Sequence, residues 1–358
     1  MATDCIELIR ELSEAFGPSG FEDDVLSVIR KYAGRFGRIE EDRLRNLYVY
    51  RSENTGDKPV LMLDAHSDEV GLMVQAVRPN GTVKFLPLGG WNKPSLPGNR
   101  MLIRNAEGKL VTGIVAAKPV HFMTAAEKES TAFEIADLSL DVGAVSKAET
   151  EELFRIAPGD PIVPLTEFRY DAERGLLFGK AFDCRIGCAA LIETLSRLSG
   201  RELSFDVVAV FSSQEEVGER GVQAAVKKVS PDIAVCFEGC PADDTFTEPW
   251  LTQTALRRGP MLRHMDKSVI CNPRFMRWAT DTAKQSGIPV QCAVREGGGN
   301  NGAVINISQG AVPVIVAGVP VRYIHSPNCI AAYSDFENTV RLAVRLAENM
   351  TPAVTDSF

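Results

Sequence analysis

The sequence lacks three features that would each assign the chain to a specialised class. Its eight cysteines do not form the CxxC pairs typical of structural zinc sites. No stretch approaches the roughly 18 consecutive apolar residues that a membrane span needs. Residues 1–5 contain no basic segment followed by an apolar one, so we expect no secretory signal. These absences favour the reducing cytoplasm, where thiols stay free.

Positive charge is also in short supply. Lys and Arg number 39 against 47 Asp and Glu, which gives a formal net charge of -8 and a pI near 5.3. This balance argues against binding to nucleic acid or to an anionic membrane, and it leaves cations and amine-bearing substrates open. The 358 residues exceed the usual size of a single hydrophobic core, so we expect two domains.

The hydrophobic pattern divides the chain into an α/β domain and a β-rich insertion. Helical and strand patterns alternate in 1–69 and again in 167–358, which is typical of an open α/β sheet. Between them, residues 70–166 contain short alternating stretches separated by turn signals such as Pro79-Asn80-Gly81. That spacing predicts a small β-barrel or sandwich. Near the amino terminus, Ser19 and Glu22 have capping-box spacing, which predicts that they open a helix.

Polar side chains follow the apolar strands of the α/β domain. His66 and Asp68 come just after the run 60–63, where strand alternation places both on one side. This pair suits a metal-binding imidazole that is oriented by a carboxylate, and a simple His–Asp hydrogen bond suits it equally well. Glu215 and Glu216 follow the run 205–211, and in extended backbone they would point to opposite sides. If both glutamates are functional, they would therefore have different roles. The alternative is that the pair is a solvated strand end without a function.

Three more groups stand at such ends. Asp183 precedes a helix that it could instead cap, Glu238 follows the strand 233–237, and His325 follows the strand 319–323. Ligands of open α/β sheets bind beyond the carboxyl ends of the strands. Two histidines and three carboxylates suit two divalent ions, because one carboxylate can bridge them. With one further glutamate, the set predicts metal-assisted hydrolysis.

Four motifs resemble those of a known family, in the same order over nearly the whole chain. They are 65–71 (AHSDEVG), 182–183 (FD), 214–218 (QEEVG) and 322–327 (RYIHSP). They are similar to motifs of the tetrahedral (TET) and glutamyl aminopeptidase family, whose members are often labelled endoglucanase M-like. The resemblance implies a mixed-sheet α/β/α metallo-exopeptidase domain (1–69 plus 167–358). It also implies that the β-rich, barrel-like domain (70–166) mediates homo-oligomers from dimers to dodecamers.

The resemblance also implies a role for each polar residue. Glu215 would be the general base, and Asp68 would orient His66. Asp183 would bridge two divalent ions, which would be zinc, cobalt or manganese. His66 and Glu238 would complete the ligands of one ion, and Glu216 and His325 those of the other.

The expected activity is that of an aminopeptidase acting on peptides with a free N-terminus. Water activated by two metal ions would attack the peptide carbonyl, with Glu215 carrying the proton. The same chemistry would serve an N-acyl amino acid deacylase or amidohydrolase, and a catalytically silent oligomeric scaffold is a third reading. A glycosidase would instead need paired carboxylates around a sugar cleft.

The sequence departs from the family pattern at several positions. Glu238 stands where the family usually has Asp. Cys184 replaces a second Asp, Asn300-Asn301 replaces Thr-Asp, and Asn328-Cys329 replaces Val-Glu. The last three are not metal ligands in the family pattern. The missing negative charge is expected to affect substrate preference and rate.

Overall fold

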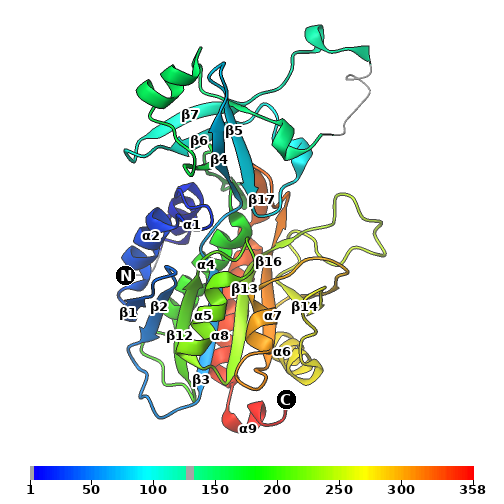
Figure 1. Cartoon of the computed structure of the whole chain (residues 1–358). Helices are drawn as coiled ribbons and strands as arrows, with labels where there is room; N and C mark the ends of the chain where they lie inside the picture. The colour runs from blue at the N-terminus through cyan, green and yellow to red at the C-terminus, as the bar shows by residue number, and fades with distance from the viewer. Residues whose placement is uncertain (1–3, 126–132) are drawn as a thin grey trace.

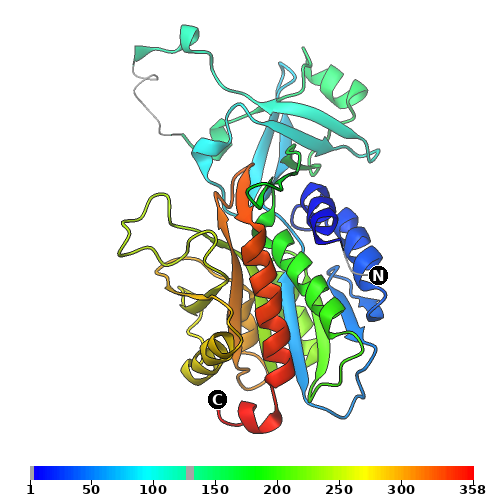
Figure 2. The same cartoon turned by 180° about the vertical axis from the view of Figure 1, so that it is seen from behind.

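The computed structural model describes residues 4–125 and 133–358. They form a large mixed sheet flanked by helices, with a smaller closed barrel at one end (Figures 1 and 2). The eleven strands of the large sheet follow the order β1-β2-β12-β3-β13-β16-β17-β11-β10, and β14 pairs with β15 and β16. This architecture confirms the predicted α/β fold class.

Four parallel strands form the centre of the large sheet. Strand β3 (Val60–His66) lies between β12 (Asp206–Ser212) and β13 (Ile233–Pro241), and β16 (Val314–Arg322) pairs with β13. They are buried over nearly their whole length because helices cover both faces. Their carboxyl ends therefore meet at one edge. The other strands are β1 (Gly37–Glu41), β2 (Leu47–Arg51), β10 (Arg169–Asp171), β11 (Leu176–Gly179), β14 (Met261–Met265), β15 (Gln291–Val294) and β17 (Cys329–Ala332).

Helices pack on both faces of this sheet. Helices α4 (Phe182–Leu198) and α8 (Tyr333–Asn349) cover one face, and α5 (Arg220–Val229) and α7 (Asn301–Asn306) cover the other (Figures 1 and 2). Helix α4 contacts α1 and α2, and α8 contacts α6. Among the described residues, no helix combines the length and apolar character that crossing a membrane requires. The remaining helices are α1 (Cys5–Glu14), α2 (Asp23–Ala33), α6 (Pro273–Gln285) and α9 (Pro352–Thr355).

The barrel follows β3 directly and lies beyond the carboxyl ends of the parallel strands (Figure 1). A separate apolar core that includes Leu72, Phe85 and Ile162 fills it. Its six strands close in the order β4 (Gly71–Val77), β5 (Val83–Leu88), β8 (Leu140–Asp141), β7 (Leu110–Val115), β6 (Arg100–Arg104) and β9 (Pro161–Pro164). Short helical turns connect them: η1 (Lys93–Ser95), η2 (Val120–Phe122), η3 (Ile135–Asp137) and η4 (Glu149–Leu153).

Ser19 and Glu22 do not form the predicted capping box. Glu22 precedes α2, but its side chain makes no capping bond to that helix. Ser19 Oγ instead donates to Asp68 Oδ2 at 2.6 Å, and Glu22 Oε1 accepts from the main-chain N–H of Gln214 at 3.2 Å. Both side chains therefore form hydrogen bonds at the carboxyl edge of the sheet instead of capping the helix.

A buried ion cluster joins the N-terminal helices to the same edge. Lys180 Nζ lies 2.5 and 2.7 Å from the two carboxylate oxygens of Glu69, and Arg185 Nη2 lies 3.2 Å from one of them. Arg185 also donates to main-chain carbonyl groups at the end of α1 and after β3. All three side chains are almost fully buried, so one carboxylate compensates two cations.

Replacing Glu69 with Gln is expected to destabilise the protein strongly. Lys180 and Arg185 would remain buried without their counter-charge, which costs about 3–5 kcal/mol. We expect the melting temperature to fall by at least about 6 °C, measured by differential scanning calorimetry. Glu107→Gln is the control, because it breaks an exposed pair with Lys109 and should leave Tm nearly unchanged. Equal small shifts in the two variants would contradict this role of the cluster.

Candidate metal centre

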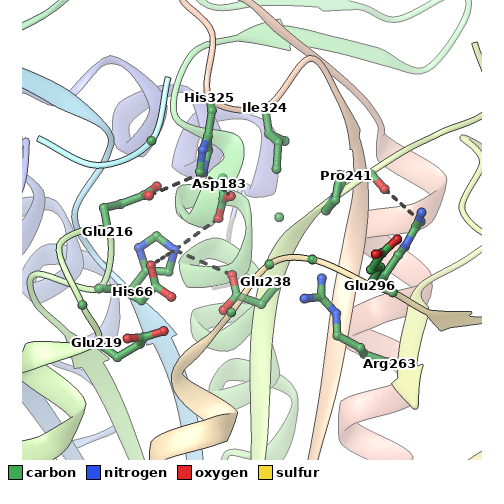
Figure 3. A pocket seen from close by; sticks show the side chains of 18 residues that line it. His66, Asp183, Glu216, Glu219, Glu238, Pro241, Arg263, Glu296, Ile324 and His325 are labelled. Atoms are coloured by element: carbon green, nitrogen blue, oxygen red, sulfur yellow. Dashed lines mark hydrogen bonds and ion pairs between the residues drawn. The ribbon is translucent and has the colours of Figure 1, made fainter. Parts of the chain in front are cut away.

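The predicted ligands meet in one cavity at the carboxyl edge of the sheet. His66 ends β3, Glu238 lies in the second half of β13, and Asp183 lies in the first, irregular turn of α4. The others come from the segments that follow β12 and β16. Figure 3 shows the side chains converging from these elements. The cavity has a volume of about 510 Å³. Six of the site residues predicted from the sequence are among those that line it: His66, Asp183, Glu215, Glu216, Glu238 and His325.

Asp183 lies between the two histidines. Its Oδ1 is 3.1 Å from His66 Nε2, and its Oδ2 is 3.4 Å from His325 Nε2. Each histidine nitrogen also faces a carboxylate of its own. Glu238 Oε2 lies 3.6 Å from His66 Nε2, and Glu216 Oε2 lies 3.4 Å from His325 Nε2 (Figure 3). The cluster thus consists of two similar halves that share one carboxylate.

These spacings fit ligands of divalent ions. Tetrahedral ligands at about 2.0–2.1 Å from zinc are separated from one another by about 3.3–3.4 Å. The separations between the imidazole nitrogens and carboxylate oxygens fall on both sides of that value, from 3.1 to 3.6 Å. Glu216 Oε1 is buried and has no hydrogen-bond partner among the described residues, as expected of an atom reserved for an ion. Imidazole and carboxylate ligands together suit borderline-hard divalent metals.

The extended backbone in which Glu215 and Glu216 would point to opposite sides does not continue to these residues. Both line the cavity, because β12 already ends at Ser212 and Gln214 has a φ of 53° that turns the chain out of the extended form. Their carboxylates still face different partners. Glu216 approaches His325, whereas Glu215 Oε2 comes no nearer than 3.9 Å to His66 Nε2.

The pKa values show that the cavity is short of positive charge. Burial raises the pKa of Glu238 to about 8, with a contribution from Asp183. Burial, with Glu238 and Glu216 nearby, also holds the pKa of Glu215 well above its ordinary value. Although burial opposes protonation of His325, Glu216 and Asp183 outweigh it and raise the pKa of that imidazole to about 11. Divalent cations would supply the charge that otherwise comes from bound protons.

Asp68 lies behind His66 rather than in the cavity. Its Oδ1 is 3.3 Å from His66 Nδ1, and it accepts the main-chain N–H of Glu215 at 3.0 Å. Nδ1 makes no hydrogen bond of good geometry among the described residues, but the facing carboxylate favours a proton on Nδ1, which would leave the lone pair of Nε2 free for a metal ion. The structure therefore places Asp68 where a carboxylate that orients the imidazole has to lie.

Sequence patterns did not indicate four charged residues of the cavity wall: Glu219, Arg263, Arg295 and Glu296. Arg263 is buried, donates from Nη1 to Asp266 Oδ2 at 2.9 Å, and has no hydrogen-bond partner for Nε among the described residues. A charged residue inside the apolar strand β14 is a signal that could have found it. Glu219, Arg295 and Glu296 lie outside the strands and carry no such signal.

Two of the positions that depart from the family pattern, Cys184 and Asn301, lie behind the cavity wall. Cys184 is buried, and its Sγ donates to the carbonyl group of Phe237 at 3.2 Å. Asn301 is also buried, and its Nδ2 donates to Asp64 Oδ2 and to Ser212 Oγ, each at 2.7 Å. Neither Cys184 nor Asn301 lines the cavity. The carboxylate of Asp64 lies beside Asn301, so this region is not depleted of negative charge.

A mixed α/β sheet that gathers two histidines and four acids at its carboxyl edge defines a metal-dependent hydrolase. Residues 46–342 match the family model described as M42 glutamyl aminopeptidase. The chain belongs to this family, as the sequence motifs predicted, and it is therefore an aminopeptidase that depends on divalent metal ions.

Similar proteins cover nearly the whole chain. The glutamyl aminopeptidase of Lactococcus lactis subsp. cremoris is 32% identical over 329 residues, which cover 92% of this chain and 91% of that protein. The lysyl aminopeptidase of Pyrococcus furiosus is 29% identical, with 97% of each chain covered. Among solved structures, a TET aminopeptidase from a marine sediment archaeon of the Thaumarchaeota is 34% identical, with a TM-score of 0.94 and 99% of each chain covered.

Proposed function

We propose that the protein removes N-terminal residues from peptides with the help of two divalent ions centred on Asp183. The supporting observation is that the two oxygens of Asp183 face different histidines. In this proposal Asp183 is shared between the ions. Zinc, cobalt or manganese would be bound by His66 and Glu238 on one side and by Glu216 and His325 on the other.

Glu215 is the proton carrier in this proposal. Bound ions would lower the pKa of a water molecule and polarise the peptide carbonyl group. Glu215 accepts the proton of the attacking water and later donates it to the leaving amine. Its position in the cavity, farther from a histidine than the proposed ligands, and its raised pKa both support this assignment.

Glu215→Gln should keep about two metal equivalents per chain and lose at least about a hundredfold in kcat. The amide preserves the shape of the side chain but cannot accept the proton. Steady-state kinetics and elemental analysis of the same samples measure both quantities. Glu219→Gln, from the same cavity wall, is the comparator and should lose less than about tenfold. An unchanged kcat in Glu215→Gln would refute the assignment, and a metal-free wild-type protein would favour the silent scaffold.

The cavity wall also supports a preference for acidic N-terminal residues. Arg263 is almost fully buried, and its guanidinium group points toward the cavity (Figure 3). A substrate carboxylate there would meet a buried guanidinium group that is paired with Asp266 through Nη1 but has no hydrogen-bond partner for Nε among the described residues, whereas a lysyl side chain would meet like charge. The relatives include both a glutamyl and a lysyl aminopeptidase, so the proposed preference rests on Arg263 alone.

A panel of glutamyl, leucyl and lysyl anilides, with N-acetylglutamate beside them, tests the substrate class. We expect the highest kcat/KM for the glutamyl anilide. Arg263→Gln should lower that value by about thirtyfold or more and change the leucyl value by less than about threefold. The matched variant Arg263→Lys keeps the charge and should retain more of the glutamyl activity. Faster hydrolysis of N-acetylglutamate would favour the deacylase, and equal losses on all anilides would make Arg263 structural.

We also propose that the chain forms homo-oligomers through residues 70–166. A solved structure of PhTET1-12s is described as a dodecamer, and the Pyrococcus horikoshii TET1 peptidase is described as able to assemble into a tetrahedron or a large octahedral shell; each is 27% identical to this chain. In this chain, β7 exposes Leu110 and Ile114, and the turn η2 exposes Val120 and Phe122. Apolar side chains of this kind mark association surfaces. The eight free thiols support a cytoplasmic location for the assembly.

Charged substitutions on the barrel should break this assembly. Ile114→Asp with Phe122→Asp is expected to lower the mass measured by light scattering to that of a smaller species, because burying the added carboxylates is unfavourable. The same pair of changes at Ile270 and Ile307, which are exposed outside the barrel, is the control. A monomeric wild-type protein would contradict the proposal.

A further inference from the structure

Asp68 links His66 to the main chain of both cavity glutamates. Its Oδ1 faces His66 Nδ1 at 3.3 Å and accepts the N–H of Glu215 at 3.0 Å. Its Oδ2 accepts the N–H of Glu216 at 3.2 Å and the hydroxyl group of Ser19 at 2.6 Å. Three of these groups belong to the centre itself. The fourth, Ser19, comes from the segment between α1 and α2.

The backbone holds Ser19 firmly beside Asp68. Its neighbour Pro18 forms a parallel β-bridge with Glu69, and the N–H of Glu69 donates to the carbonyl group of Gly17 at 3.1 Å. Ser19 is buried, and Asp68 is completely buried. A hydroxyl–carboxylate bond of 2.6 Å in such surroundings is of the strong, charge-assisted kind.

The same segment also holds the residue that turns the glutamates into the cavity. Glu22 is fully buried, and its Oε1 accepts from the N–H of Gly20 at 2.8 Å and from the N–H of Gln214 at 3.2 Å. Gln214 is the residue with the left-handed φ just before Glu215. The segment 17–22 therefore contacts the loop 214–216 at two points, directly through Glu22 and through Asp68 by way of Ser19.

We propose that Ser19 is a positioning residue of the metal centre. Its hydroxyl group fixes the orientation of Asp68, and Asp68 in turn fixes the ring of His66 and the main chain of Glu215 and Glu216. Ser19 lies before residue 46, where the match to the family model begins. The inference rests on the proposed roles of these groups, and it adds a residue that touches neither substrate nor metal.

Without the Ser19 hydroxyl group, Asp68 loses one of its four neighbours and gains freedom to rotate. The His66 ring and the loop 214–216 would then be held less precisely, although every proposed ligand remains. Removing a group that orients a metal ligand typically costs 10–100-fold in metal affinity or activity. A loosened centre should lower kcat more than it raises KM, because substrate side-chain contacts such as Arg263 lie on the opposite wall (Figure 3).

The test compares three variants whose folding is first checked by thermal unfolding. Ser19→Ala should lower kcat by about 10–100-fold with KM changed less than about threefold, and should weaken zinc binding about tenfold or more. Zinc affinity is measured by competition with a chromophoric chelator on protein stripped of metal. Ser19→Thr keeps the hydroxyl group and should restore kcat to within about fivefold of the wild type.

The matched control is Ser13→Ala in α1. Ser13 is equally buried, and its Oγ donates to the carbonyl group of Lys180 at 2.8 Å, but it does not contact Asp68. It should lose stability without losing kcat or zinc affinity. A folded Ser19→Ala with wild-type kcat and zinc affinity would overturn the proposal, as would equal losses in Ser13→Ala. Zinc affinity also separates the positioning role of Ser19 from the proton-carrier role of Glu215. It reports on Ser19 even if the Glu215→Gln variant shows that another group carries the proton.

Discussion

The repulsion among four buried or partly buried acids at one edge of the sheet is the constraint on which the rest of the structure depends. Asp183, Glu215, Glu216 and Glu238 share a single cavity, and the pKa of Glu238 rises to about 8 mainly because of burial. Such a cluster is stable only if cations enter it or if protons neutralise it. The two histidines lie between the acids, and the main-chain N–H groups of the glutamates are bound to Asp68 from behind. The protein thus supplies the side chains that could bind cations and the hydrogen bonds that hold them, but too little positive charge to balance the acids.

The turns around the cavity have a backbone conformation that strands and helices do not provide. Among the described residues, eleven that are not glycine have a positive φ, and five of these adjoin or belong to the cavity. Such conformations cost about 1–3 kcal/mol each and persist where the surroundings fix them. They lie where strands end and side chains have to turn toward a common point. These residues are Ala181, Gln214, Glu219, Tyr323 and His325.

The sequence was sufficient to predict the fold class and the strand-end groups, because both follow from local periodicity. His66 and His325 each follow an apolar run that ends at the carboxyl edge. Strand order was beyond prediction, since it depends on pairing between segments far apart in the chain. The common direction of Glu215 and Glu216 could not be predicted for a related reason. It depends on the turn at Gln214, whose N–H is bound by Glu22, 192 residues earlier.

The capping-box prediction failed because two partners compete for the same side chains. Ser19 and Glu22 have the spacing that suits a helix N-terminus, but the N–H groups of an exposed terminus can be satisfied by water. Asp68 is completely buried and has no such alternative. A hydroxyl group therefore stabilises the structure more at Asp68 than at the helix. In most of the chain the local sequence pattern and the tertiary contacts favour the same structure, whereas at the metal centre they favour different ones.

The replacement of Asp by Asn at position 301 follows from the same electrostatic constraint. Asn301 Nδ2 lies 2.7 Å from Asp64 Oδ2, so an aspartate here would place two buried carboxylates in contact. Burial raises the pKa of Asp64 to about 6, and the amide of Asn301 opposes that rise by donating to the ionised form. Asn at 301 therefore avoids a contact between two buried carboxylates and donates a hydrogen bond to Asp64. Because both lie behind the cavity wall, substrate selection falls to groups that line the cavity, among them Arg263 and Arg295, each of which has a buried Nε without a hydrogen-bond partner among the described residues.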